Sequence, residues 1–406
     1  MRASGVPRES MASRRAAMPT RTPMMLLGAI LLLLAGCSGG DSGSASAGGG
    51  LAGTPSAPSP SFSLEPGDGD AEVNPASDIA VSAADGTLHD IVLTDPDGTE
   101  VAGELNAEQT RWESSEPLGY AATYTWGGRV EGADGETVEV GGSFDTLTPD
   151  SQPRATINPV DDATVGVAMP VSVKFPEQPI PDEAKAAVEE RLTVDTSVPV
   201  EGSWAWLGDN QVDWRPKDYW PADTEVAVRA DLYGLDYGGG AFGKADLTTD
   251  FTIGRNQVVK LDTRSHRMIV ERDGVQTADY PASYGEDDNP DLATPNGTFM
   301  VMTKEEVGNF SNPDYGYTDV EKKWALRFSN HGEFIHENEE NRDNIGSANT
   351  SHGCVNLFEA DAKDYFDSAL IGDPIEITGS GTTLPPQYDV YDWQIPWEDW
   401  VQRSAL

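Results

Sequence analysis

Between about residue 71 and residue 254 the chain is a succession of short runs in which side chains alternate in character, each ended by a turn signal. Residues 91–93 run into Asp-Pro-Asp-Gly, and residues 120–126 and 137–140 each end at a Gly-Gly pair. A period of two places alternate side chains on opposite faces of a strand, and frequent turns favour antiparallel neighbours. This pattern predicts antiparallel β-sandwiches with little helix.

The pattern recurs, which predicts two similar modules. An Asn-Pro pair opens each module, at Asn74 and at Asn158, and Trp112 has a counterpart in Trp214. The spacing is irregular, so the duplication rests on these markers and not on a fixed period. In the second module, residues 182–192 predict a helix, because apolar side chains recur in this stretch at helical spacing. Asp182 is its expected N-cap.

Neither module offers a set of residues suited to catalysis. His89 is isolated, and residues 236–240 hold one carboxylate among glycines, which indicates a turn and not a cation site. The tryptophans of the second module are predicted to be core and interface residues, with a sugar-binding strip as the alternative: Trp204, Trp206, Trp214 and Trp220.

The N-terminus has the pattern of a bacterial lipoprotein signal. Residues 1–22 carry five arginines and one glutamate, and the apolar run 24–34 is too short to span a bilayer but suits a signal-peptide core. The run ends in Leu-Ala-Gly-Cys, which resembles a lipobox and implies cleavage before Cys37 and lipidation of its sulfur. A plain signal peptide with a chance cysteine is the alternative. Residues 38–69 are rich in Gly, Ser, Ala and Pro and predict a flexible tether.

The formal charge of -41, from 27 Lys+Arg against 68 Asp+Glu, sets limits on the partners of this chain. An acidic surface repels phosphate, so nucleic acid and anionic lipid are excluded as electrostatic partners. The charge is typical of a solvated surface, and adaptation to high salt is the other interpretation.

Cys354 is the second of only two cysteines, so lipidation of Cys37 leaves it without a disulfide partner. It lies in Ser-His-Gly-Cys-Val-Asn, residues 351–356, and His336 ends a short predicted strand upstream. Residues 357–370 have helical periodicity, and Asn356 with the glutamate three residues later suggests a capping box. A thiol just before a helix N-terminus has a lowered pKa, so we expect an activated thiolate at Cys354.

These residues suit acyl transfer through a thioester. His336 serves as base and acid, and the amides around Gly353 and Cys354 are candidate oxyanion donors because glycine lets the backbone approach a carbonyl closely. One alternative is a buried structural cysteine. The other is a zinc site built from His331, His336, His352 and Cys354.

The motif Ser-His-Gly-Cys, with His336 upstream and Thr-Pro-Asn-Gly-Thr-Phe at 294–299, resembles the active-site signature of L,D-transpeptidases. The whole layout, with a Trp-rich tail at 392–400, is similar to the mycobacterial-type enzymes of actinobacteria. The resemblance implies a mainly β fold, with two immunoglobulin-like β-sandwich modules and a mostly β catalytic domain with one main helix after the active-site cysteine. It divides the chain into a signal peptide (1–36), the lipidated cysteine and linker (37–69), immunoglobulin-like domains (70–152 and 153–254), a catalytic domain (255–379) and a C-terminal extension packed on the catalytic domain (380–406).

The activity implied by the resemblance is 3→3 cross-linking of peptidoglycan. Cys354 attacks the carbonyl of the third residue of a tetrapeptide stem, D-alanine leaves, and the amine of a second stem displaces the thioester. No cofactor or metal is implied. The partners are donor and acceptor stems and the outer face of the cell membrane, which the lipid on Cys37 would hold. Protein attachment or hydrolysis by the same thiol, and a wall-binding scaffold with an inactive catalytic module, are the alternatives.

The resemblance also assigns the site residues. The catalytic residues are Cys354, His336 and His352, and the pocket and oxyanion residues are Ser351, Gly353 and Asn356. A flap at residues 302–324 covers the donor, and the substrate contacts are Tyr317, Trp324, His331, Gly332, Phe334, Glu337 and Thr350. Glu337 departs from the small serine common in this branch, and we expect its carboxylate to raise the pKa of His336.

Overall fold

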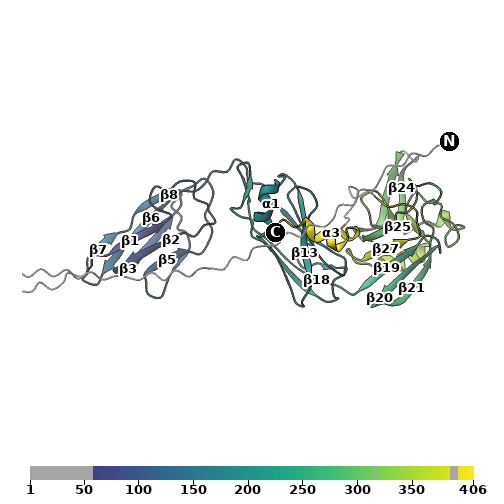
Figure 1. Ribbon diagram of the computed structural model, residues 1–406, viewed down its shortest axis with the longest axis horizontal. Coiled ribbons are helices and arrows are strands. Elements are labelled where there is room, and N and C mark those ends of the chain that lie inside the picture. Colours follow the sequence, from purple (N-terminus) through teal and green to yellow (C-terminus); the bar gives the residue numbers. More distant parts are fainter. Residues whose placement is uncertain (1–57, 314–315, 385–391) are drawn as a thin grey trace, which may run out of the picture. The chain divides into compact units, whose positions relative to one another are not determined.

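The computed structural model describes residues 58–313, 316–384 and 392–406, which are mostly strands (Figure 1). The predicted signal peptide and Cys37 lie outside the described residues. Among the helices of the described ranges, none is long and apolar enough to cross a bilayer.

The first module is a sandwich of two four-stranded sheets. One sheet has the order β1-β2-β5-β4, and in the other β6 pairs with β3, β7 and β8. The rings of Trp112 and Trp126 meet edge to face at 5.4 Å in the core between them. The strands are β1 (Ser61–Glu65), β2 (Ala80–Ala84), β3 (Gly86–Thr94), β4 (Gly103–Leu105), β5 (Arg111–Ser114), β6 (Thr123–Gly132), β7 (Thr137–Glu139) and β8 (Gly142–Asp145).

The second module is a sandwich of the sheets β13-β14-β11-β9 and β10-β18-β15-β12, with the hairpin β16-β17 beside them. The prediction of a turn at residues 236–240 is confirmed only for Gly239 and Gly240, because residues 236–238 form β16. The elements are β9 (Thr156–Asn158), β10 (Thr164–Val165), β11 (Val171–Lys174), α1 (Asp182–Glu189), β12 (Leu192–Thr196), β13 (Gly202–Trp206), β14 (Gln211–Pro216), β15 (Glu225–Ala230), β16 (Asp236–Gly238), β17 (Ala241–Phe242) and β18 (Leu247–Ile253).

Helix α1 exists but differs from its prediction at both ends. Its N-cap is Pro181, which makes no side-chain cap, and Asp182 is the first helical residue and pairs with Lys185 at 2.7 Å. The helix ends at Glu189 because Leu192 already belongs to β12, where it pairs with β15. The requirement to complete that sheet overrides the helical periodicity of residues 190–192.

The two sandwiches share a packing device that supports the predicted duplication. Gly103 pairs with the residue two positions after Trp112, and Gly202 pairs with the residue two positions after Trp214. A Cβ added at Gly103 would lie 2.1 Å from Trp112 Cζ2, and one at Gly202 would lie 2.0 Å from Trp214 Cζ2. In each module only glycine leaves room for the indole to lie across the neighbouring strand.

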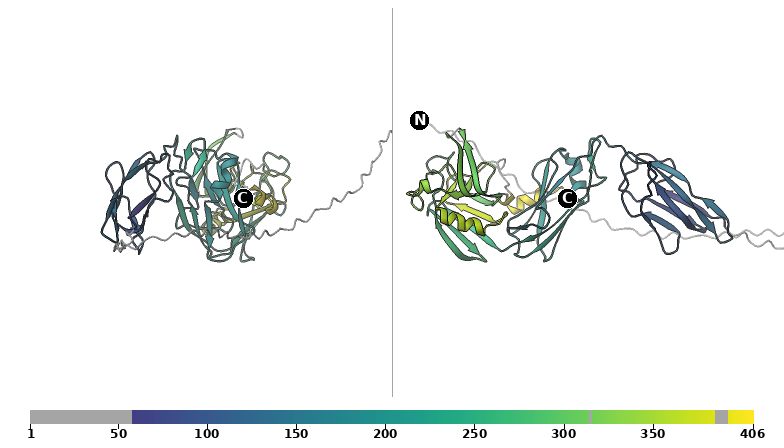
Figure 2. Two further views of the ribbon diagram at one scale, coloured as in Figure 1. Left: turned by 60° about the vertical axis from the view of Figure 1, so that its left-hand side comes forward. Right: turned by 180° about the vertical axis from the view of Figure 1, so that it is seen from behind.

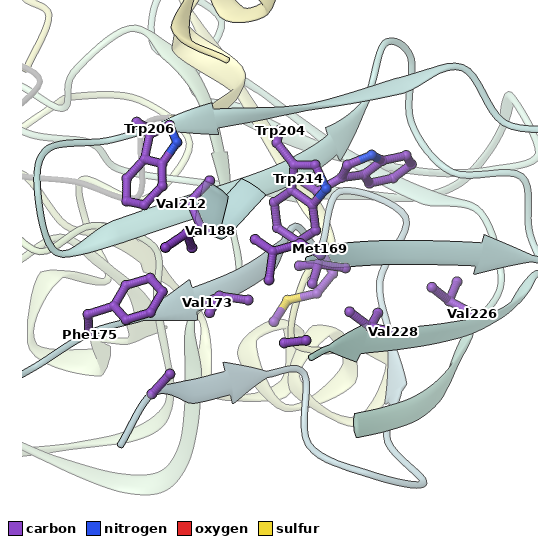
Figure 3. Close-up of a cluster of buried hydrophobic side chains, with 14 of the residues drawn as sticks. Met169, Val173, Phe175, Val188, Trp204, Trp206, Val212, Trp214, Val226 and Val228 are labelled. Carbon is purple, nitrogen blue, oxygen red and sulfur yellow. The ribbon is translucent and has the colours of Figure 1, made fainter. Parts of the chain in front are cut away.

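The tryptophans of the second module are core residues, so the alternative of a sugar-binding strip is wrong. Trp204, Trp206 and Trp214 are each no more than 8% exposed, and Trp220 is 2% exposed. Figure 3 shows the indoles with Phe175, aliphatic side chains and Met169 in one apolar cluster between the strands. Such burial leaves the rings no face on which a sugar could stack.

The catalytic module has two sheets. The order of the first is β21-β20-β19-β27-β22, and the predicted hairpin of residues 257–271 is confirmed by the antiparallel pairing of β19 with β20. The order of the second is β23-β24-β25-β26, with β25 and β26 parallel. Helix α2 lies against β24 and β25 (Figure 2). The elements are β19 (Gln257–Asp262), β20 (Arg267–Arg272), β21 (Val275–Pro281), β22 (Gly297–Met300), β23 (Thr303–Asn312), β24 (Tyr317–Arg327), β25 (Phe334–Glu337), η2 (Glu339–Asn341), β26 (Val355–Leu357), α2 (Glu359–Ser368) and β27 (Pro374–Thr378).

The C-terminal segment consists of η4 (Asp392–Gln394), α3 (Trp397–Trp400) and η5 (Val401–Arg403). We expected it to pack on the catalytic module, but only η4 lies beside β22, whereas α3 and η5 lie on β13 of the second sandwich. The cause is Arg215 of β14, whose guanidinium carbon lies 4.6 Å from the ring centres of both Trp393 and Trp400. Its guanidinium also donates to the carbonyl of Ile395 at 2.8 Å. Cation–π contact with a largely desolvated arginine holds the segment there.

An ion pair joins the start of the catalytic module to the turn before β27. Asp373 is fully buried and accepts two hydrogen bonds from the guanidinium of Arg255, at 2.6 and 2.9 Å. The amides of Gln257 and Leu370 also donate to its carboxylate, at 3.2 and 2.9 Å. Four donors thus satisfy a carboxylate that would otherwise be costly to bury.

Replacing Asp373 with alanine should lower the free energy of unfolding of this module by about 3 kcal/mol, because the variant leaves Arg255 and its neighbours without their acceptor. The measurement is urea unfolding of the protein. Asp367→Ala is the matched control, since Asp367 pairs with Lys363 on the exposed face of α2 and should cost at most about 0.5 kcal/mol. Equal losses in the two variants would contradict the role given to Asp373.

Candidate active site

Cys354 and His336 open into one cavity of about 380 Å³. Its walls come from the hairpin β23-β24, the end of β25 with η2, and the segment that leads into β26. The lining residues are Phe310, Tyr317, Val320, Lys322, His336, Asn338, Glu340, Asn341, Thr350, Ser351, His352, Cys354 and Asn356.

The parallel pairing of β25 with β26 places the two catalytic candidates side by side. His336 pairs with Asn356, and Cys354 lies two residues before Asn356. Paired residues of neighbouring strands project from the same face of the sheet, so His336 and Asn356 share a face. Cys354 lies just before β26 and lines the same cavity, although 17 residues separate it from His336 in the sequence.

Short hydrogen bonds fix the segment before β26. Ser351 Oγ donates to the carbonyl of Cys354 at 2.6 Å and accepts from the amide of Gly353 at 3.2 Å. Thr294 Oγ1 donates to the carbonyl of Gly353 and accepts from the amide of Gly285, both at 2.8 Å. Thr294 opens the upstream motif Thr-Pro-Asn-Gly-Thr-Phe, so the structure supplies a physical reason for that motif: its hydroxyl clamps the loop that carries the thiol.

Gly353 has a backbone conformation that requires glycine. Its φ is +111°, and a Cβ added there would lie 3.2 Å from Cγ of Glu333. Since its amide already donates to Ser351, the Gly353 amide is committed to holding the loop. The amide of Cys354 itself is therefore the better candidate for an oxyanion donor.

His336 is held by a backbone carbonyl. Its Nδ1 lies 2.7 Å from the carbonyl oxygen of Glu337. Since a carbonyl can only accept, Nδ1 carries the proton, and Nε2 of the neutral ring is the basic nitrogen. The ring of Phe310 packs on the imidazole with 5.1 Å between centres.

The expectation that Glu337 raises the pKa of His336 is wrong. Burial lowers the pKa of His336 to about 4, and the bond to the Glu337 carbonyl offsets this only in part. The Glu337 carboxylate points elsewhere and accepts from the amides of Lys323 and Glu339, at 3.3 and 3.2 Å. The Glu337 carboxylate is therefore paired with backbone amides of β24 and of η2, and this side chain does not raise the pKa of the imidazole.

The expectation of a thiolate stabilised by a helix is also wrong. Strand β26 stands between Cys354 and α2, which begins at Glu359 after the N-cap residue Phe358. Phe358 has no capping side chain, and the amide of Glu359 donates to Glu339 Oε1 at 2.9 Å. Asn356 lies within β26 and forms no capping box. The Cys354 thiol donates to the carbonyl of Gly332 at 3.9 Å, and burial raises the pKa of this thiol to about 12. The thiol and the imidazole therefore line the same cavity as two neutral groups.

The structure brings together some of the residues predicted to contact substrate and not others. Thr350, His352 and Tyr317 line the cavity, and the rings of the last two lie 5.7 Å apart. Trp324 does not line it. Its φ of +55° breaks the alternation of β24, and the indole packs on Phe366 of α2 with 5.5 Å between ring centres.

The strand and turn before His336 support the cavity without lining it. Phe334 packs on Phe310 with 4.6 Å between ring centres, and His331 Nδ1 lies 2.6 Å from a carboxylate oxygen of Glu333. Gly332 meets the thiol through its carbonyl. In the part of the chain that the structure describes, His331, His336, His352 and Cys354 do not assemble into a group that could hold a metal.

Three further lining residues, Phe310, Val320 and Lys322, lie within the predicted flap but were not named as substrate contacts. Asn338, Glu340 and Asn341 were not predicted to line the site. Alternation along β24 places Val320 and Lys322 on one face, so their common orientation could have been predicted. The pairing of β24 with β25 decides which face of β24 is turned toward Cys354. No local signal in the sequence specifies that pairing.

Comparisons with known proteins identify the family of this chain. Residues 70–236 match the model of a bacterial Ig domain, and residues 256–377 match that of the L,D-transpeptidase catalytic domain. L,D-transpeptidase 5 of Mycobacterium tuberculosis is 44% identical over 86% of this chain and 78% of its own length. L,D-transpeptidase 2 of the same species is 34% identical over 83% of each chain. A crystal structure of L,D-transpeptidase 1 from M. tuberculosis is 29% identical, with a TM-score of 0.43, over 56% of this chain and 99% of its own. This chain belongs to the L,D-transpeptidase family.

Proposed function

We propose that this protein forms 3→3 cross-links in peptidoglycan, with Cys354 as the nucleophile and His336 as the general base and acid. The observation that carries the proposal is the pairing of β25 with β26, which brings His336 beside the segment that holds Cys354, so that both side chains line one cavity. Family membership supports the transpeptidase activity.

The steps follow from the neutral pair. His336 Nε2 takes the thiol proton as Sγ attacks the carbonyl of the third stem residue, and the amide of Cys354 stabilises the oxyanion. The C–N bond to D-alanine breaks, His336 gives its proton to the departing amine, and a thioester remains on Cys354. The amine of a second stem then attacks the thioester, and His336 receives a proton from that amine. The departing thiolate of Cys354 takes up this proton from His336. Tyr317, His352 and Thr350 would contact the donor, since they line the cavity.

A neutral pair has an advantage on the cell surface. A thiol whose pKa is about 12 is a poor target for oxidants, because the thiolate is the reactive form. The nucleophile would arise only when a bound carbonyl lies within reach and His336 can accept the proton. The same groups therefore protect the thiol at rest and activate it during the reaction.

The first prediction concerns Cys354. Cys354→Ala should abolish both cross-linking of a tetrapeptide donor and formation of a covalent carbapenem adduct in an intact-mass measurement, because it removes the acyl acceptor. Cys37→Ser is the matched control, since it changes the only other cysteine and should leave both reactions intact. Cross-links formed by Cys354→Ala would contradict the proposal, and release of D-alanine by the native protein without cross-links would favour a hydrolase.

The second prediction concerns pH. His336 accepts a proton only when neutral, which holds above its pKa of about 4, and its basicity is lost as the pH falls through that value. The rate of carbapenem acylation should therefore be nearly constant from about pH 6 to about pH 9 and fall toward pH 4. A rate that rises tenfold per pH unit up to about pH 8.5 would indicate an unassisted thiol of ordinary pKa and would contradict the role of His336.

We also propose that lipid on Cys37 anchors the protein to the outer face of the cell membrane, facing the wall. The support is the sequence before Cys37, which lies outside the described residues. In cells, Cys37→Ser should move the protein from the detergent phase to the aqueous phase of a Triton X-114 partition. Cys354→Ala serves here as the control that stays in the detergent phase. A Cys37→Ser protein that remains there would rule out the anchor.

A further inference from the structure

Lys322 is the feature of the cavity that the proposed reaction does not use. Among the described residues that line the cavity, it is the one lysine or arginine. The chain as a whole carries 68 acidic residues against 27 basic ones. A single cation inside a cavity of so acidic a protein attracts anionic ligands locally against a repulsive surface.

Two neighbours of Lys322 fix the position of its ammonium group, but the one that carries a negative charge is exposed to solvent. Nζ donates to Asn338 Oδ1 at 3.0 Å and to Glu340 Oε2 at 3.1 Å. The Lys322 side chain is 12% exposed, whereas the Glu340 side chain is 86% exposed. The cation is therefore fixed in the wall, while its counter-ion is free to swing into solvent at little cost.

The same loop reaches the nucleophile. Asn341 of η2 accepts a hydrogen bond from Thr350 Oγ1 at 3.1 Å and donates to Ser283 Oγ at 3.2 Å. A line of polar groups thus runs from Lys322 on β24, through η2, to the segment that carries Cys354. A carboxylate bound at Lys322 would lie in the same cavity as a carbonyl at Cys354.

We propose that Lys322 is the carboxylate-binding residue of the donor subsite and that Glu340 is the counter-ion which a substrate carboxylate displaces. This inference rests on the proposed function, because the ligand is a carboxylate of the donor stem. Two donor carboxylates have this chemistry: the terminal carboxylate of the departing D-alanine and the side-chain carboxylate of the diamino acid. A carboxylate on Lys322 forms charge-assisted hydrogen bonds that a carboxamide cannot equal.

Steady-state kinetics with matched donors test this. With an acid donor, Lys322→Met should raise KM about 10- to 100-fold, as expected for loss of a hydrogen bond between charged groups. Lys323→Met is the control: it removes the same charge one residue away, where Nζ pairs with Glu359 outside the cavity, and it should leave KM unchanged. Glu340→Gln, at an exposed position, should lower KM because Lys322 loses its competitor.

Amidated donors identify the carboxylate. If the terminal D-alanine carboxamide abolishes the difference between native protein and Lys322→Met, Lys322 binds the leaving group. If only amidation of the diamino acid does so, Lys322 binds that side chain. Equal losses by Lys322→Met on all donors, with a loss instead of a gain for Glu340→Gln, would show a purely structural pair and overturn the inference. Native protein that turns over no donor would overturn the proposed function, and the inference with it.

A second readout is independent of the donor. The charged and titratable groups that share the cavity with His336 are Tyr317 and Lys322 on β24, Glu340 on η2, and His352 and Cys354 before β26. After burial itself, the charge of Lys322 contributes to the lowered pKa of His336. Alkylation of Cys354 by neutral iodoacetamide should therefore lose rate at a higher pH in Lys322→Met than in Lys323→Met. Superimposable pH profiles would show that the Lys322 charge does not reach His336.

Discussion

The parallel pairing of β25 with β26 is the constraint on which the catalytic geometry depends. It is short, and its three pairs set the relative position of Cys354 and His336. A slip of one residue would turn Cys354 to the opposite face of the sheet. The hydrogen bonds from Thr294 and Ser351 act at the same place, since both fix the backbone immediately before β26. Most residues of the signature motif therefore serve to hold the register of β25 and β26, and the thiol of Cys354 is the reactive group of the motif.

Desolvation then determines the electrostatics of this pair. Burial raises the pKa of Cys354 and lowers that of His336, so each group is driven toward its neutral form. Neutral groups are compatible with a partly apolar cavity, whereas a resting ion pair would need compensation from nearby charges. The positive charge of Lys322 further disfavours the protonated form of His336. A carboxylate bound at Lys322 would screen that repulsion. The charge of the donor would then favour proton uptake by His336 at the moment when the reaction requires it.

The sequence was sufficient to predict the fold class and to single out two residues, Cys354 and His336, that the structure brings into one cavity. Alternation and turn residues indicated the sandwiches, and the motif around Cys354 with His336 indicated the nucleophile and base. The segment after Cys354 was misjudged because a strand of three residues, Val355–Leu357, is too short to show its own periodicity next to a helix. The expectation of a lowered thiol pKa failed for that reason. Trp324 was misjudged because its packing partner Phe366 comes from a distant segment, and because a positive φ at Trp324 reverses the alternation expected of a strand. Lys322 was not singled out, since its neighbours Asn338 and Glu340 also lie in another segment.

The second sandwich meets the catalytic module on the sheet that does not carry the catalytic pair. The amides of Gly166 and Ala168 donate to the carbonyls of Ile371 and Gly372, just before β27, at 2.7 and 2.9 Å. The hydroxyl of Tyr219 donates to Glu376 within β27 at 3.0 Å. A Cβ added at Gly166 would lie 2.1 Å from the amide nitrogen of Asp373, so the two backbones meet closely at this point. These contacts fall on the sheet β21-β20-β19-β27-β22, whereas the hairpin β23-β24 and His336 belong to the sheet β23-β24-β25-β26. The second sandwich therefore supports the core of the catalytic module through β27, on a different sheet from the one that carries His336.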